Sequence, residues 1–98
     1  MKILALEHEL RNVPAEKFQQ YACLEAARAW ELYQGGVIRE LYFRHDRPEA
    51  VLVLECDDLE SARQVLSSLP LVENGLITFE LIPLRAYPGF ARLFKENL

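Results

Sequence analysis

AVLVLEC, at residues 50–56, is the stretch of sequence that decides the fold. Its first five residues are apolar without interruption, which is typical of a central strand covered on both faces. Turn-forming residues precede it at 45–49, and an extended run lies before them at 37–45. These two runs and their turn predict a β-hairpin, with residues 50–56 on its inner side.

A helix is predicted on each side of this hairpin along the chain. Residues 14–34 form the first helix, because a proline suits its first turn and two glycines follow its end. The second helix opens at Asp57, which makes a capping-box-like pair with Glu60, and Pro70 stops it. Residues 71–75 are then expected to form a loop.

Two further strands, at residues 2–9 and 76–84, complete a β-α-β-β-α-β order. Right-handed crossovers place the strands at 2–9 and 50–56 in the centre and the other two at the edges. Both helices then cover one face of a four-stranded antiparallel sheet. The predicted fold is therefore α+β, a ferredoxin-like split β-α-β arrangement, in a single domain of residues 1–98 with an aromatic C-terminal tail at 85–98.

The sheet face opposite the helices has no predicted cover from its own chain. In the strand at 50–56 both alternating rows are apolar, Val51 and Val53 on one side, Leu52 and Leu54 on the other. Large exposed apolar patches usually mark interfaces. We therefore expect a two-fold homodimer, or a higher homo-oligomer, packed sheet against sheet. The alternative is a monomer whose aromatic tail folds across this face.

Charge and composition exclude several classes of protein. The net charge is −4 with only 11 basic residues, and no two of them are adjacent, so we expect no nucleic-acid partner. No apolar stretch is long enough to span a bilayer, and no signal-peptide cleavage site follows the N-terminus, so we expect a cytoplasmic protein. Cys23 and Cys56 stand alone and are predicted to be reduced thiols.

Glu25 carries the strongest indication of chemistry. At about 100° per residue it lies in the centre of an apolar stripe on the first helix. The stripe is formed by Phe18, Ala22, Ala29 and Leu32. A carboxylate buried there without a partner would be strongly destabilising. Either Glu25 is a proton-transfer group with a raised pKa in a pocket between helix and sheet, or it forms a structural ion pair with an inward arginine such as Arg39.

The strand at 37–45 should present two different faces. The row expected to face the helices, where an arginine can meet Glu25, consists of Val37, Arg39, Leu41 and Phe43. The row expected to face the dimer interior consists of Ile38, Glu40, Tyr42 and Arg44. His8, Glu55 and Glu80 are further polar residues in strands that otherwise read as buried. With Glu40 and Tyr42 they can line a polar cavity; for any one carboxylate, an exposed edge position is the alternative.

The sequence contains no motif for a metal or a cofactor. His8 and His45 are far apart, and no helical pair of metal ligands accompanies them, so we predict no metal site. A phosphate-cradling glycine loop, a nucleophile elbow and a dinucleotide fingerprint are all missing. We therefore predict no cofactor.

Several segments resemble the muconolactone isomerase-like family of the dimeric α/β-barrel superfamily. They are residues 25–44, with Gly-Gly-Val-Ile-Arg-Glu-Leu-Tyr at 35–42, together with Ser-Leu-Pro-Leu at 68–71 and Arg-Ala-Tyr-Pro at 85–88. The resemblance implies sheet-to-sheet dimers, higher oligomers in some members, and a cofactor-free proton shift beside a lactone carbonyl. It also implies a catalytic role for Glu25, which matches a family glutamate, and for Arg39, which matches a basic residue.

Three positions depart from the family pattern. Tyr42 stands where the isomerase has a tryptophan, and Tyr87 stands where it has a histidine before the tail proline. The first strand also lacks an interior lysine of the isomerase. The resemblance therefore predicts the fold more strongly than it predicts one reaction.

Three functions follow as hypotheses. The first is a cofactor-free isomerase of a small lactone or carboxylic acid, in which Glu25 moves a proton while Arg39 and Tyr42 stabilise an enolate or bind a carboxylate. The predicted ligand-binding residues are His8, Glu40, Glu55, Glu80 and Tyr87. The second is a non-catalytic dimeric domain that binds small ligands or is associated with stress. The third is a haem-dependent or cofactor-free oxygenase, which would need a histidine such as His8 facing the cavity.

Overall fold

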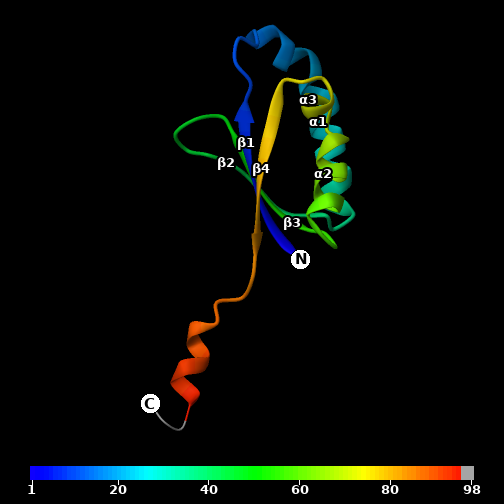
Figure 1. Ribbon diagram of the computed structural model, residues 1–98. Helices are drawn as coiled ribbons and strands as arrows, with labels where there is room; N and C mark the ends of the chain where they lie inside the picture. The colour runs from blue at the N-terminus through cyan, green and yellow to red at the C-terminus, as the bar shows by residue number, and fades with distance from the viewer. Residues whose placement is uncertain (96–98) are drawn as a thin grey trace.

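The computed structural model describes residues 1–95, and its elements follow the predicted order (Figure 1). A strand and a long helix are followed by a hairpin, two shorter helices, a last strand and a 3₁₀ helix. The elements are β1 (Lys2–Glu9), α1 (Ala15–Gln34), β2 (Ile38–Phe43), β3 (Ala50–Glu55), α2 (Leu59–Ser67), α3 (Pro70–Glu73), β4 (Ile77–Leu84) and the 3₁₀ helix η1 (Gly89–Phe94). Within residues 1–95 no helix has the length and apolar character needed to cross a membrane.

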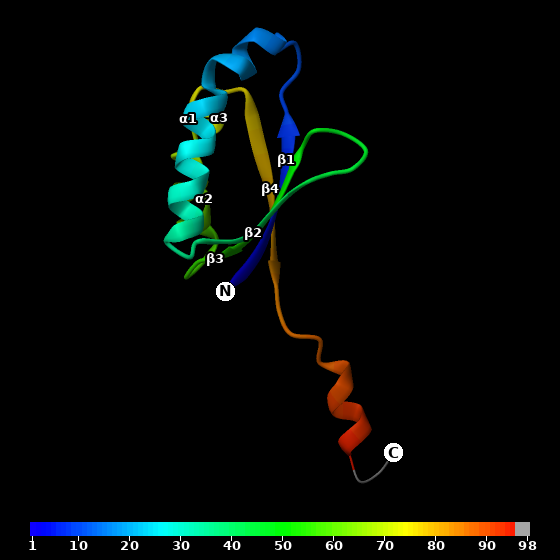
Figure 2. The ribbon, with the colours of Figure 1, turned by 180° about the vertical axis from the view of Figure 1, so that it is seen from behind.

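The four strands form one antiparallel sheet in the order β2-β3-β1-β4. β1 and β3 are central, as right-handed crossovers require, and β2 and β4 are the edges. The helices α1, α2 and α3 all lie on one side of the sheet, and no helix of the described chain lies over its other side (Figures 1 and 2). This arrangement confirms the predicted ferredoxin-like fold.

The uncovered side of the sheet is called the open face below. Cross-strand pairing brings together on it Leu4, Leu6, His8, Val51, Val53, Thr78, Glu80 and Ile82. Val51 and Val53 are only partly covered there, whereas Leu52 and Leu54 are buried on the helix side. β3 therefore buries the row of Leu52 and Leu54 against the helices of its own chain, and the row of Val51 and Val53 lies on the open face.

The hydrophobic core lies between the sheet and the helices. Its buried members are Ile3, Ala5, Leu32, Ile38, Ala50, Leu52, Leu54, Ala62, Leu66 and Leu69. Burial of apolar side chains contributes most of the stability of such a core. Because α1 contributes only Leu32 to the fully buried set, much of its apolar stripe faces a space that the chain does not fill.

Two details of the second helical region differ from the prediction. The residue that caps α2 is Asp58, whose Oδ1 accepts the backbone N–H of Ser61 at 2.7 Å, so the cap is one residue later than Asp57. Pro70 does not lead into a loop but occupies the first turn of α3, where its missing N–H is not needed. The loop predicted at 71–75 is therefore in large part a short helix.

A β-bulge in β2 overturns part of the predicted alternation. The pairing with β3 shifts between Ile38 and Glu40, so Ile38 lies opposite Leu54 and is buried in the core. Arg39 is the extra residue; it is exposed, and its Nε donates to the carbonyl oxygen of Gly36 at 2.6 Å. The predicted face of Ile38 is wrong, because one extra residue reverses the alternation before it. Arg39 still lies beside α1, since it lines a cavity together with Ala29, Trp30 and other residues of that helix.

Beyond the bulge the backbone register follows the predicted alternation, although Tyr42 and Glu40, predicted to face the dimer interior, also border a cavity beside α1. Leu41 lies opposite Leu52 and Phe43 opposite Ala50, so both face the helix side. Tyr42 lies opposite Val51, on the open-face side of the pairing. Leu41 and Phe43 nevertheless remain exposed, because the space between them and α1 is a cavity that other side chains do not fill.

Residues 85–95 are called the arm and extend away from the sheet and the helices (Figures 1 and 2). The arm includes η1, and its large apolar side chains are strongly exposed, with Phe94 at 84% and Tyr87 and Phe90 at 66% each. The alternative in which the tail covers the open face of its own chain is therefore not the arrangement found.

Candidate active site

A cavity of about 870 Å³ lies between α1 and the helix-facing side of the sheet. Most of its lining is apolar and includes Phe18, Ala22, Ala26, Ala29, Leu41, Phe43, Leu52, Leu69, Leu71 and Phe79. Three carboxylates interrupt this lining: Glu7, Glu9 and Glu25. Apolar cavities of this size with a few convergent polar groups are typical of small-molecule sites.

Glu7 is the most strongly perturbed acid of this cavity. It follows Ile3 and Ala5 on the helix-facing row of β1, and it is only 8% exposed. Burial raises its pKa from 4.5 to about 7; a hydrogen bond from the backbone N–H of Ala50, at 3.4 Å, opposes this rise. The negative charges of neighbouring glutamates raise the pKa further. Near neutral pH the group can therefore both give and take a proton.

Glu7 is not among the site residues predicted from the sequence. The signal was the two-residue period of β1, which places Glu7 in phase with the buried Ile3 and Ala5. It was obscured because Glu7 begins a run of three polar residues, which reads as the solvated end of a strand.

Glu25 lies in the same cavity and comes from α1. Its Oε1 accepts the backbone N–H of Leu71, in the first turn of α3, at 2.9 Å. Burial raises the pKa of the Glu25 carboxyl group, and the Leu71 hydrogen bond opposes the rise. No arginine or lysine within residues 1–95 forms an ion pair with Glu25. The alternative, an ion pair with Arg39, is not formed: Arg39 Nε donates to the carbonyl oxygen of Gly36, and Arg39 lines the neighbouring cavity between α1 and β2.

Arg39 and Tyr42 line a second, smaller cavity of about 570 Å³ between α1 and β2. The Tyr42 hydroxyl donates to Glu40 Oε1 at 2.8 Å, and this hydrogen bond raises the pKa of Tyr42, which therefore stays a neutral phenol at neutral pH. Trp30 and Tyr33 form another wall and stack with ring centroids 5.8 Å apart. Both cavities are lined by Ala26, Ala29, Leu41 and Tyr42, so they adjoin.

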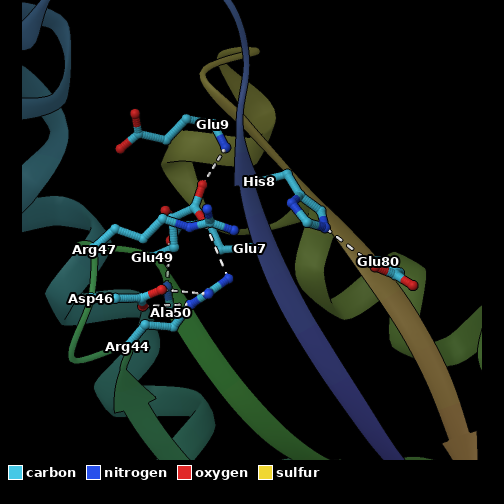
Figure 3. Close-up of polar contacts among 9 residues, drawn as sticks. All are labelled: Glu7, His8, Glu9, Arg44, Asp46, Arg47, Glu49, Ala50 and Glu80. Carbon is cyan, nitrogen blue, oxygen red and sulfur yellow. Dashed lines mark hydrogen bonds and ion pairs between the residues drawn. The ribbon is translucent and has the colours of Figure 1, made fainter.

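The other predicted ligand-binding residues lie in different places. His8 Nε2 is 3.3 Å from Glu80 Oε1 on the open face, and Figure 3 shows His8 and Glu7 on opposite sides of β1. Glu55 pairs with the N-terminal amino group at 3.5 Å, at the end of the sheet. Tyr87 is on the arm and packs edge-on against Phe90. Of that set, Glu40 alone lies beside a cavity that adjoins the one holding Glu25.

The loop between β2 and β3 is held by an ionic cluster next to Glu7 (Figure 3). Arg44 binds the Asp46 carboxylate through two hydrogen bonds of 2.9 and 2.7 Å, and Arg47 pairs with Glu49. Glu49 also accepts the backbone N–H of Glu9 at 3.3 Å, which ties this loop to β1. The two arginines are thus engaged by other carboxylates, and neither forms an ion pair with Glu7 within residues 1–95.

The lining of the main cavity contains no lysine, arginine or histidine among the described residues. In the same part of the chain no group of three His, Cys, Asp or Glu side chains is arranged to hold a metal ion. His8 points to the open face, so the condition that an oxygenase would need, a histidine in the cavity, is not met. What the cavity offers chemically is a pair of shielded carboxyl groups in apolar surroundings.

The fold and this cavity define a class of protein: a small ferredoxin-like α+β chain whose helix-side cavity holds carboxyl groups with raised pKa. The profile of the muconolactone delta-isomerase family matches residues 6–89, and the chain belongs to this family. A crystal structure of muconolactone isomerase is similar, with a TM-score of 0.71 and 21% sequence identity over 90% of this chain and 92% of that chain. This likeness confirms the predicted fold, that of the dimeric α/β-barrel class. A comparison with curated proteins found no match.

Proposed function

We propose that this protein is a cofactor-free isomerase that moves a proton within a small lactone or carboxylic acid. The observation that carries the proposal is the presence of two carboxyl groups with raised pKa, Glu7 and Glu25, in one apolar cavity. Acids and bases whose pKa lies near the working pH are the most effective proton-transfer catalysts. Membership of the muconolactone delta-isomerase family supports the same reaction class.

The two carboxyl groups can divide the roles of base and acid. The charge of Glu25 is one of the causes that raise the pKa of Glu7, so the ionised form of one favours the protonated form of the other. Ionised Glu25 takes a proton from the carbon next to the substrate carbonyl, and the electron pair moves onto the carbonyl oxygen as an enolate. Protonated Glu7 then delivers its proton to another carbon of the conjugated system, and a proton returns from Glu25 to Glu7. The sequence of steps needs no oxidant or reductant.

The smaller cavity is suited to the carboxylate of a substrate. Arg39 lines it, and its only hydrogen bond within residues 1–95 is the one from Nε to Gly36, which leaves its terminal amino groups for an anion. Tyr42 borders both cavities and can contact a substrate that extends from one cavity into the other. In this proposal Arg39 and Tyr42 bind the substrate, and the proton chemistry takes place at Glu25 and Glu7.

The working unit in this proposal is a homodimer packed through the open face. The apolar area of this face comes from a half-covered row of side chains: Leu4, Leu6, Val51, Val53 and Ile82. The His8–Glu80 pair lies at the border of this row. An extended, half-covered apolar face of this kind is stabilised by burial against a second copy.

Proton transfer can be tested without knowing the product. The protein is incubated in D₂O with a panel of unsaturated lactones and aromatic acids, and exchange of carbon-bound hydrogen is followed by proton NMR. We expect deuterium to enter beside the carbonyl of at least one lactone. Glu25→Gln should lower the exchange rate by at least about 100-fold, the usual contribution of a general base. Glu31→Gln, an exposed change on the same helix, is the matched control and should exchange at the wild-type rate.

Two outcomes would overturn the proposal. Binding of a lactone, detected by thermal shift, without any exchange would favour the non-catalytic ligand-binding alternative. Exchange that persists unchanged in Glu25→Gln would remove Glu25 from the reaction.

A further inference from the structure

The main cavity continues along α1 on both sides of Glu25. Ala29 lies one helical turn after Glu25 and lines both cavities, so this side leads to the smaller cavity and to Arg39. Phe18 lies seven residues before Glu25, about 10 Å along the helix axis, and lines only the main cavity. The two ends of the main cavity therefore differ, because only one of them leads to a cation.

The part of the cavity beside the first turns of α1 is called the Phe18 end below. Phe43 belongs to this end: it pairs with Ala50, whose N–H binds Glu7 near the end of β1, and α1 begins soon after β1 ends. Phe43 is 71% exposed although it lines the cavity. Phe79 of β4, another residue of the lining, lies directly opposite Glu7. The Phe18 end thus offers aromatic surface that the chain itself does not cover.

The side chains next to Glu25 leave room for a substituent of the substrate. Ala22, one helical turn before Glu25, contributes only a methyl group to the lining. The cavity volume of about 870 Å³ lies in the upper part of the range of roughly 300–1,000 Å³ that is typical of sites for drug-sized molecules. A group attached beside the reacting carbons therefore has space to extend from Glu25 to Phe18.

A charged group at the Phe18 end is disfavoured. Glu7 and Glu9 line the cavity, whereas none of the described lysines, arginines and histidines does, and the arginines of the β2–β3 loop are bound by carboxylates of that loop. An anion would be desolvated here without a counter-charge and repelled by ionised Glu25. A cation would hold Glu25 in an ion pair and remove the base that the proposed reaction needs. The described cation that does border these cavities, Arg39, lies beyond the opposite end.

We propose that the substrate is a lactone with a large uncharged apolar substituent, aryl or branched alkyl, which lies at the Phe18 end of the main cavity. The lactone carbonyl then lies beside Glu25, and any carboxylate of the substrate lies at Arg39, on the other side. Ala22 determines the specificity, because a larger side chain at this position closes the passage between Glu25 and Phe18. The inference rests on the proposed function for the reacting group and adds the chemical class of the remaining part of the substrate.

Calorimetric titration with saturated γ-lactones tests the preference, because these probes bind without being isomerised. The γ-phenyl lactone should bind at least about tenfold more tightly than the γ-methyl lactone, since even one methylene in an apolar pocket changes affinity by about tenfold or more. Ala22→Leu should weaken binding of the phenyl lactone at least about tenfold. Ala27→Leu, the same change at an exposed position of α1 that lines neither cavity, is the control and should leave its affinity within about twofold.

Two further measurements locate the substituent and test its charge. In ¹³C,¹⁵N-labelled wild-type protein, isotope-filtered NMR should show nuclear Overhauser effects from the phenyl protons of the ligand to the Ala22 methyl group and the Phe18 ring. The γ-(4-carboxyphenyl) lactone has the same shape with an added anion. In Arg39→Gln, which cannot attract that anion to the opposite end, it should bind at least about tenfold more weakly than the phenyl lactone.

Each of four results would overturn the inference: equal affinities for the methyl and phenyl lactones, equal effects of Ala22→Leu and Ala27→Leu, Overhauser effects to Trp30 and Tyr33 in place of Ala22, or equal binding of the charged and uncharged aryl lactones. The unsaturated forms of the same lactones in D₂O test the proposed function separately. A phenyl lactone that binds at the Phe18 end without hydrogen exchange counts against the isomerase and leaves the ligand class in place. Exchange without any preference for the phenyl lactone does the reverse.

Discussion

Replacement of Glu7 by glutamine should change how stability depends on pH. The carboxyl group of Glu7 has a pKa of about 7 in the folded protein and an ordinary value of 4.5 without the fold. Between these two values the folded state holds more protons than the unfolded state, so the free energy of unfolding falls as pH rises. The favourable contribution is full below about pH 4.5 and is lost above about pH 7. Glutamine resembles the protonated acid in shape and has no such titration.

The size of the effect follows from the difference between the two pKa values. At about 1.4 kcal/mol for each tenfold change, the rise from 4.5 to about 7 corresponds to about 3 kcal/mol. The cavity is open to solvent between α1 and β2, and screening there reduces this figure to about 2 kcal/mol. Glu7→Gln should therefore match the wild type near pH 4 and be more stable by about 2 kcal/mol at pH 8.

Urea unfolding at pH 4, 6 and 8, followed by circular dichroism at one fixed protein concentration, measures the effect. Glu73→Gln is the matched control; Glu73 is exposed and forms no ion pair within residues 1–95, and the change should shift the free energy of unfolding by less than about 0.5 kcal/mol at every pH. If wild type and Glu7→Gln lose stability in parallel between pH 4 and 8, burial does not raise the pKa of Glu7 and the assignment of a proton donor to this position is wrong.

Two further predictions concern the framework that holds the site. Asp58→Ala should lower the thermal unfolding midpoint by a few degrees, because the N–H of Ser61 loses its partner, while Asp57→Ala should leave it nearly unchanged; equal effects would refute the corrected cap. Leu54→Ala, at a fully buried core position, should cost about 2–5 kcal/mol in chemical unfolding, whereas a loss below about 1 kcal/mol would mean that this strand is not central.

Most of the element order could be predicted from the sequence because it depends on local signals. The apolar run at 50–56, the proline before α1 and the glycines after it all act on the backbone within a few residues. Once six elements are known, the handedness of crossovers leaves few arrangements, and the sheet order follows. Helical periodicity also placed Glu25 on the inner side of α1, but it left open whether Glu25 faces a cavity or pairs with an arginine.

Other features depended on contacts between distant segments. The bulge at Arg39 arises where β2 pairs with β3, and no local sequence pattern predicts it. The contact between Arg39 and Glu25 that the regular alternation allowed is therefore not formed. The hydrogen-bond partner of Glu25 is the backbone N–H of Leu71. Every residue except proline has such an N–H group, so the sequence could not identify this partner.

The sequence by itself determined the elements, their order in the sheet and the acid on the inner side of α1. The tertiary structure decided which acids share a cavity: Glu7 reads as the polar end of a strand, and only its position between the start of β3 and the cavity beneath α1 buries it and raises its pKa. It also decided the direction of the arm, whose apolar residues the sequence alone allowed to fold either over their own sheet or away from it. The physical reason is that secondary structure follows from neighbours along the chain, whereas burial and pKa follow from neighbours in space.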